Sequence, residues 1–128
     1  MKFSELLKKL RLEKKLTLRE CALKLEVDPS NWSKMERGIN PAPKHRDILK
    51  RWATFFKLTD RPKQEFFDTA ALSRHEIPYD IASDETLLSK MPAFFRSIRG
   101  AELNDRELRE FVKEMRELYT RDAEKQDE

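Results

Sequence analysis

The chain has few glycines, one cysteine and no long apolar run. Two glycines in 128 residues, together with scarce β-branched residues, disfavour an all-β fold, which needs turn glycines and strand formers. The single cysteine, Cys21, cannot form an internal disulfide, and no His/Cys cluster indicates zinc. The apolar runs are too short to cross a membrane, and the first residues are amphipathic rather than a signal peptide. We therefore expect a cytoplasmic, all-α protein without cofactor or metal.

Charge is distributed unevenly along the chain. Residues 1–60 carry 15 basic and 8 acidic side chains, whereas residues 61–128 carry 12 basic and 16 acidic. The basic half suits contacts with DNA phosphates, because each contact releases condensed counterions. The same lysines and arginines also solvate helices, and charge alone does not separate these two interpretations. The asymmetry indicates two parts with separate roles.

Apolar residues recur at helical spacing from the start of the chain. The spacing within residues 3–10 marks one face of a helix. Thr17 begins a second helix with a predicted capping box, in which Glu20 reaches back toward the Thr17 backbone. Cys21 lies on the apolar side of this second helix, so we expect it in the core.

A third helix is predicted between Asp28 and Gly38. Asp28 is a favoured N-cap, Pro29 fits the first helical position, and Gly38 suits the residue after the C-cap. Only Trp32 and Met35 are apolar on this helix, and both are expected to be buried. Two short helices joined by a tight turn, the second largely polar on one side, follow the plan of a helix-turn-helix.

Two further helices, over residues 44–57 and 62–74, carry apolar faces that suit packing onto the first three. Pro78 then breaks the chain. The sequence therefore predicts a five-helix domain over residues 1–75 and a helical C-terminal extension over residues 76–128.

The extension has its own capping and breaking signals. Ser83 is predicted to cap a short helix, and a separate aromatic-rich helix is predicted to follow Pro92 and to stop at Gly100. Asn104 is predicted to begin the last helix, with Glu107 completing a second capping box. Apolar residues at alternating spacings of 3 and 4 give that helix a narrow apolar stripe.

Residues 3–58 resemble the Cro/repressor-type (Xre) helix-turn-helix family. The run Ser33–Gly38, which reads Ser-x-x-Glu-Arg-Gly, is highly typical of that family. Two positions depart from its commonest form: Glu26 stands where a turn glycine is frequent, and Trp32 stands where Tyr, Leu or Ile is usual. The resemblance rests on two segments, Leu16–Ala22 and Val27–Gly38.

The resemblance implies a non-enzymatic regulator, most simply a repressor, that binds double-stranded DNA through the third helix. It also implies that Arg11 pairs with Glu36 to orient that helix. By position, the base-contacting residues would be Pro29, Ser30, Asn31, Ser33 and Lys34. The phosphate-contacting residues would be Thr17, Arg19, Arg37, Asn40, Lys44 and Arg46. The competing interpretation of the polar face is an ordinary solvated helix surface.

An enzyme is not indicated by the remaining chemistry. The two histidines, His45 and His75, have no nucleophile or metal ligand at a helical spacing, and no Gly-rich phosphate loop is present.

Members of the resembled family usually dimerise on pseudo-palindromic sites, so we expect a homodimer. Packing of the same apolar residues within one monomer remains the alternative, since periodicity does not separate the two. A second alternative is an antitoxin, or a protease-controlled regulator, whose C-terminal half binds a toxin or a protease. The residues predicted for a dimer or partner interface are Met91, Phe94, Phe95, Ile98, Leu108, Phe111, Val112, Met115, Leu118 and Tyr119.

Overall fold

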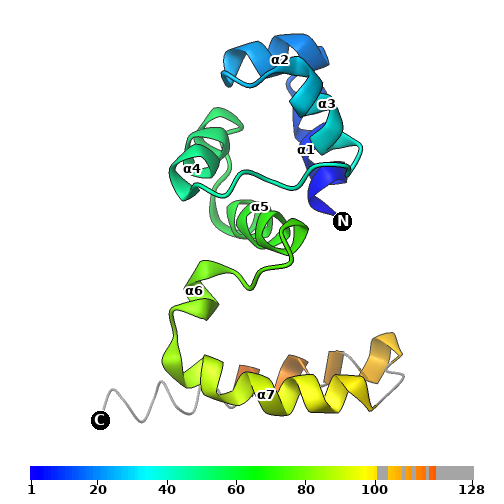
Figure 1. Ribbon diagram of the computed structural model, residues 1–128, viewed down its shortest axis with the longest axis vertical. Helices are drawn as coiled ribbons and strands as arrows, with labels where there is room; N and C mark the ends of the chain where they lie inside the picture. Colours follow the sequence, from blue (N-terminus) through cyan, green and yellow to red (C-terminus); the bar gives the residue numbers. More distant parts are fainter. Residues whose placement is uncertain (101–103, 108, 111, 115, 118–128) are drawn as a thin grey trace. The chain divides into compact units, whose positions relative to one another are not determined.

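The computed structural model describes residues 1–100, 104–107, 109–110, 112–114 and 116–117 (Figure 1). Within these residues the secondary structure is helical, without strands, which confirms the all-α prediction. The chain divides into two units, Met1–Pro78 and Tyr79–Glu128. None of the helices in the described ranges is long and apolar enough to span a membrane.

Five helices with defined bounds belong to the first unit and two to the second. Those of the first unit are α1 (Phe3–Glu13), α2 (Leu18–Lys24), α3 (Pro29–Glu36), α4 (Arg46–Phe55) and α5 (Asp60–Ser73). Those of the second unit are α6 (Tyr79–Ala82) and α7 (Glu85–Arg99).

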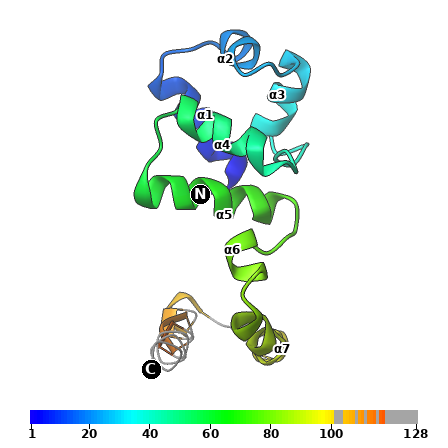
Figure 2. The same ribbon diagram turned by 90° about the vertical axis from the view of Figure 1, so that its left-hand side faces the viewer.

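The first unit is built around two aromatic contacts between different helices. α3 packs against α1 and α2, while α5 packs against α1 and α4 (Figure 2). The rings of Trp32 in α3 and Trp52 in α4 lie 5.1 Å apart, and those of Phe3 in α1 and Phe66 in α5 lie 5.5 Å apart. All four side chains are buried. Because a large aromatic ring removes much apolar surface from water, these contacts define the centre of the core.

Cys21 also lies in this core, as predicted, with no exposed surface. Burial raises the pKa of its thiol to about 11. The thiol therefore stays protonated at neutral pH, which makes it a packing group rather than a reactive one.

All five helices of the first unit end with a residue in the left-handed region. In each case the next N–H donates to a carbonyl five residues earlier, as from Val27 to Ala22 at 2.8 Å at the end of α2. Only the end of α3 uses glycine, Gly38, with φ 74°. The other four residues, with φ between 55° and 58°, are Lys15, Glu26, Lys57 and His75. Four helices thus end at a residue whose Cβ makes the left-handed backbone conformation energetically costly.

The turn of the helix-turn-helix is one of these strained ends. Glu26 has φ 58° there, and its side chain makes only an exposed ion pair with Arg51 at 3.4 Å. Such exposed pairs contribute little. A glycine, which is frequent at this position in the resembled family, would adopt this conformation without a Cβ penalty.

The second unit differs from the sequence prediction in three ways. A short helix, α6, follows Pro78 directly, where the sequence predicts only a break. In α7 the N-cap is Asp84, whose carboxylate accepts from the Leu87 N–H at 3.1 Å, and not the predicted Ser83. α7 also runs continuously through Pro92, where the sequence predicts two helices. A proline removes one backbone donor, and α7 continues despite that loss.

Both predicted capping residues accept from the third backbone N–H, but in both boxes the glutamate carboxylate meets the side chain of the capping residue and not its backbone N–H. Asn104 accepts from the Glu107 N–H at 2.8 Å, and the described residues from 105 to 117 are helical. At α2 the Thr17 hydroxyl accepts from the Glu20 N–H at 3.1 Å. The same hydroxyl donates to the Glu20 carboxylate at 2.9 Å, so this carboxylate accepts from the hydroxyl and not from the predicted backbone N–H.

We expect Glu26→Gly to stabilise the first unit by about 0.5–1 kcal/mol, because glycine adopts this backbone conformation without a Cβ penalty. Chemical denaturation of the two proteins measures the change. Leu23→Gly is the matched control, since Leu23 is exposed within α2. There glycine should destabilise by about 1 kcal/mol. If both substitutions destabilise equally, the left-handed turn is not strained.

Candidate nucleic-acid interface

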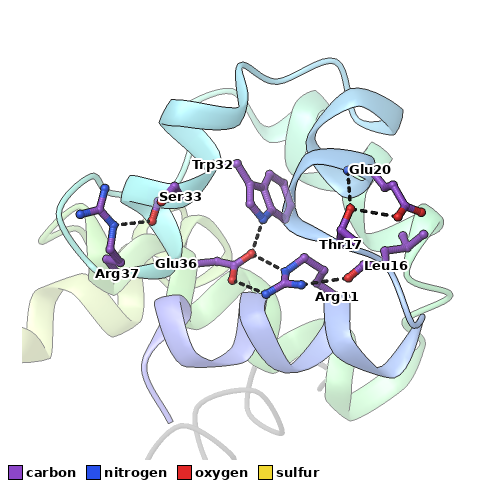
Figure 3. Close-up of polar contacts among 8 residues, drawn as sticks. All are labelled: Arg11, Leu16, Thr17, Glu20, Trp32, Ser33, Glu36 and Arg37. Atoms are coloured by element: carbon purple, nitrogen blue, oxygen red, sulfur yellow. Dashed lines mark hydrogen bonds and ion pairs between the residues drawn. The ribbon is translucent and has the colours of Figure 1, made fainter.

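α2 and α3 are joined by a short turn, and an ion pair with α1 holds the C-terminal end of α3. Arg11 of α1 reaches the Glu36 carboxylate at the end of α3 with two hydrogen bonds, from Nε at 2.8 Å and from Nη2 at 3.0 Å (Figure 3). The side chains are only 11% and 5% exposed. The predicted pair is therefore formed, and it is bidentate and nearly buried.

Two further groups complete this network. The Nη1 group of Arg11 donates to the Leu16 carbonyl at 2.9 Å, and the Trp32 indole N–H donates to the Glu36 carboxylate (Figure 3). The hydrogen bond with Glu36 raises the pKa of Arg11, so the guanidinium stays charged. Removing one member of such a buried pair typically costs about 3–5 kcal/mol, because the partner charge is left uncompensated. The network thus joins α1, α3 and the loop before α2.

The opposite side of α3 faces solvent. Successive residues of an α-helix are rotated by about 100°, so Ser30 and Lys34 project away from the buried Trp32. Ser30, Asn31, Lys34 and Arg37 are exposed, whereas Pro29 and Ser33 are half-buried. The predicted base-contacting residues therefore lie on one helix, with Ser30 and Lys34 at the centre of its outer face.

The first turn of α3 has no side-chain cap. Asp28 occupies the N-cap position, as predicted, but its side chain makes no capping hydrogen bond. Pro29 has no N–H, so the Ser30 and Asn31 amide groups are the first donors of the helix. Donors at a helix N-terminus favour an anionic or oxygen-rich partner.

The predicted phosphate-contacting residues lie in the first part of α2, in the segment that follows α3 and at the start of α4. Thr17, Arg19, Arg37, Lys44 and Arg46 are exposed, and Asn40 is half-buried. The Thr17 hydroxyl is engaged by Glu20, and the Arg37 Nε donates to the Ser33 carbonyl at 3.3 Å (Figure 3). Asn40 donates from Nδ2 to the Asn31 Oδ1 at 2.8 Å.

The predicted dimer or partner interface is described only in part. Met91 and Phe94 are half-buried, while Phe95, Ile98 and Val112 are between 37% and 46% exposed. No residue of α7 is classed as buried. The remaining predicted residues lie outside the described residues: Leu108, Phe111, Met115, Leu118 and Tyr119.

Sequence reasoning missed three contacts of this site. The Trp32–Glu36 bond joins residues four apart on one helix, so helical spacing could have indicated it. The Leu16 carbonyl and the Asn31–Asn40 contact depend on loop paths, for which the sequence carries no signal. Within the described ranges, no group of three or more His, Cys, Asp or Glu side chains is placed to hold a metal ion.

The two buried tryptophans allow a direct test of the network. Trp32 and Trp52 are 0% and 1% exposed, but the Trp52 Nε1 has no hydrogen-bond partner among the described residues. We expect Trp32→Phe to destabilise by about 1–2 kcal/mol more than Trp52→Phe, because only the former removes a bond to a charged group. Both changes remove a similar volume. Equal losses of unfolding free energy would contradict a role for the Trp32–Glu36 bond.

Comparison with known proteins adds the family. The family model described as a helix-turn-helix domain matches residues 2–66, from the start of α1 into α5. Neither the curated proteins nor the solved structures contain a match to the chain. The matched domain implies DNA as a partner, and its family is typically non-enzymatic. The chain belongs to the helix-turn-helix domain family, of the kind found in Xre/Cro-type regulators.

Proposed function

We propose that the protein is a cytoplasmic, sequence-specific repressor that binds double-stranded DNA as a homodimer. The observation that carries the proposal is the two-sided character of α3. Trp32 and Met35 are buried on one side, while Ser30 and Lys34 are exposed on the other. A polar helix face held rigidly away from a core is suited to the major groove, where each base pair presents its own pattern of donors and acceptors.

Within this proposal, α3 reads bases and the residues around it bind phosphates. Lys34 donates to guanine O6 and N7, while Ser30 and Asn31 hydrogen-bond to neighbouring groups. Pro29 offers an apolar contact, as to a thymine methyl, and Ser33 lies at the edge of the face.

Phosphate contacts fix the register of the protein on the duplex. The basic side chains proposed for them are Arg19, Arg37, Lys44 and Arg46. Asn40 is not assigned a phosphate, because its side chain donates to Asn31. Because the Thr17 hydroxyl is engaged by Glu20, a phosphate at the start of α2 would meet backbone N–H groups there.

Lys34→Ala tests the recognition face. The protein is first used to select its preferred duplex from random DNA, and binding to that duplex is measured by fluorescence anisotropy at several salt concentrations. We expect Lys34→Ala to weaken binding about 10-fold or more and to relax the preference at one base pair. The matched control is Lys9→Ala, which removes the same charge from the exposed side of α1. Equal effects of the two variants would refute base reading by α3.

The homodimer is proposed to form through the second unit. The support is the apolar surface of α7, where Phe95 is 37% and Ile98 39% exposed. An apolar face of this kind commonly marks a contact with another protein. A two-fold symmetric dimer would present two copies of α3 to the two half-sites of a pseudo-palindrome.

Substitution of this face tests the dimer. We expect the wild-type chain to sediment as a dimer and the double variant Phe95→Glu, Ile98→Glu as a monomer, because two charges would be buried without partners. The control is Leu72→Glu, at a residue of α5 that is 64% exposed. It should leave the mass unchanged. A wild-type monomer at micromolar concentration would refute the homodimer and leave the face for a different protein, such as a toxin or a protease.

A further inference from the structure

A side-chain contact between two asparagines links the recognition helix to the loop that follows it. Asn31 is exposed on the first turn of α3, and Asn40 lies beyond the end of the same helix. The Asn40 Nδ2 donates to the Asn31 Oδ1 at 2.8 Å. The contact bridges nine residues and lies at the edge of the proposed DNA-binding face.

The backbone of Asn40 is fixed by the way in which α3 ends. Gly38, with φ 74°, donates to the Met35 carbonyl at 3.1 Å. The N–H groups of Ile39 and Asn40 both donate to the Lys34 carbonyl, at 2.9 and 3.2 Å. The following Pro41 restricts the Asn40 backbone further. Asn40 is therefore a rigid support from which a side chain can hold Asn31.

We propose that Asn40 is a positioning residue that makes Asn31 a hydrogen-bond donor toward DNA. An asparagine side chain has one acceptor oxygen and one donor NH₂ group. Because the Asn31 Oδ1 accepts from Asn40, the orientation of the amide is fixed, and its Nδ2 group is turned away from Asn40, where it can donate to a ligand. That ligand is an acceptor atom of the DNA, either a phosphate oxygen or an acceptor on a base edge. The inference rests on the proposed function.

A double-mutant cycle tests the coupling. Affinity for the selected duplex is measured for Asn31→Ala, Asn40→Ala and the double variant. We expect about a 10-fold loss for Asn31→Ala and a smaller loss for Asn40→Ala. Asn40→Ala should have no further effect once Asn31 is alanine, because its role would pass through Asn31. The same loss from Asn40→Ala in both backgrounds would overturn the proposal, since Asn40 would then contact DNA by itself.

Asn40→Asp provides a reversal test. A carboxylate only accepts, so Asn31 must turn its Nδ2 toward residue 40 and present Oδ1 to the DNA. Asn40→Asp then lowers DNA affinity in two ways. One part of the loss comes from the turned side chain of Asn31. The other part, repulsion between the new carboxylate and the phosphates, remains when Asn31 is replaced by alanine. We expect a larger loss from Asn40→Asp when Asn31 is present than when it is alanine. Equal losses would overturn the proposal.

The same variant distinguishes the two acceptors. If Asn31 meets a base, repeated selection with Asn40→Asp should shift one base pair toward adenine or cytosine donors. If it meets a phosphate, affinity should fall equally for all duplexes and the preferred sequence should not change. Both results support a positioned donor.

Failure of this inference is separable from failure of the proposed function. A wild-type protein that binds no duplex, or that is insensitive to Lys34→Ala, refutes the proposed function. Binding that depends on Lys34 together with an additive Asn31–Asn40 cycle refutes only the positioning role. Thermal melting of each variant shows whether the fold is retained, and no large change is expected because Asn31 is exposed and Asn40 half-buried.

Discussion

Arg11 and Glu36 carry opposite charges into the interior of the first unit, and the placement of α3 depends on their meeting. Each charge alone would be costly at this degree of burial, and the two side chains take part in four hydrogen bonds here. The guanidinium fork fixes direction as well as distance, because two parallel hydrogen bonds form only in one relative orientation. An apolar pair of equal volume could bury as much surface, but it would leave α3 freer to rotate about its axis. Under the proposed function, in which the outer face of α3 reads DNA, restricting that rotation serves binding as well as stability.

α3 needs this support because it has little else. It is eight residues long, and only Trp32 and Met35 anchor it in the core. A helix of this length is marginal on its own. The ring contact with Trp52, the bond from its own indole to Glu36 and the glycine-ended C-terminus each restrict it at a different point. At Glu26 the same unit keeps an unfavourable left-handed backbone conformation, because the packing of α2 and α3 fixes the path of the turn between them.

Much of this could be predicted from the sequence, for physical reasons that also explain the failures. Helical spacing and capping signals are local, so α1 to α5 and the caps at Thr17 and Asn104 were predictable. The predicted helix boundary at Pro92 is wrong, because a proline removes only one backbone donor and α7 continues through it. Asp84 caps α7 where Ser83 is predicted, since both are good caps and local sequence does not rank neighbours. The Asn31–Asn40 contact depends on the path of the loop after Gly38, which no periodicity encodes.

The network and the asparagine contact act on opposite sides of the same helix. Arg11 fixes α3 from the core, and Asn40 fixes one side chain on its edge from the loop. Both depend on the end of α3: Glu36 is its last residue, and Gly38 turns the chain so that Asn40 returns along the helix. Under the proposed role of Asn40, the conformation at Gly38 is therefore coupled to recognition as well as to helix termination. A Cβ at Gly38 would be strained at φ 74°, although its 3.6 Å approach to the Ser4 side chain is ordinary van der Waals contact. A shift of the loop that relieved this strain would displace Asn40 and, with it, the support of Asn31, even if the buried pair remained intact.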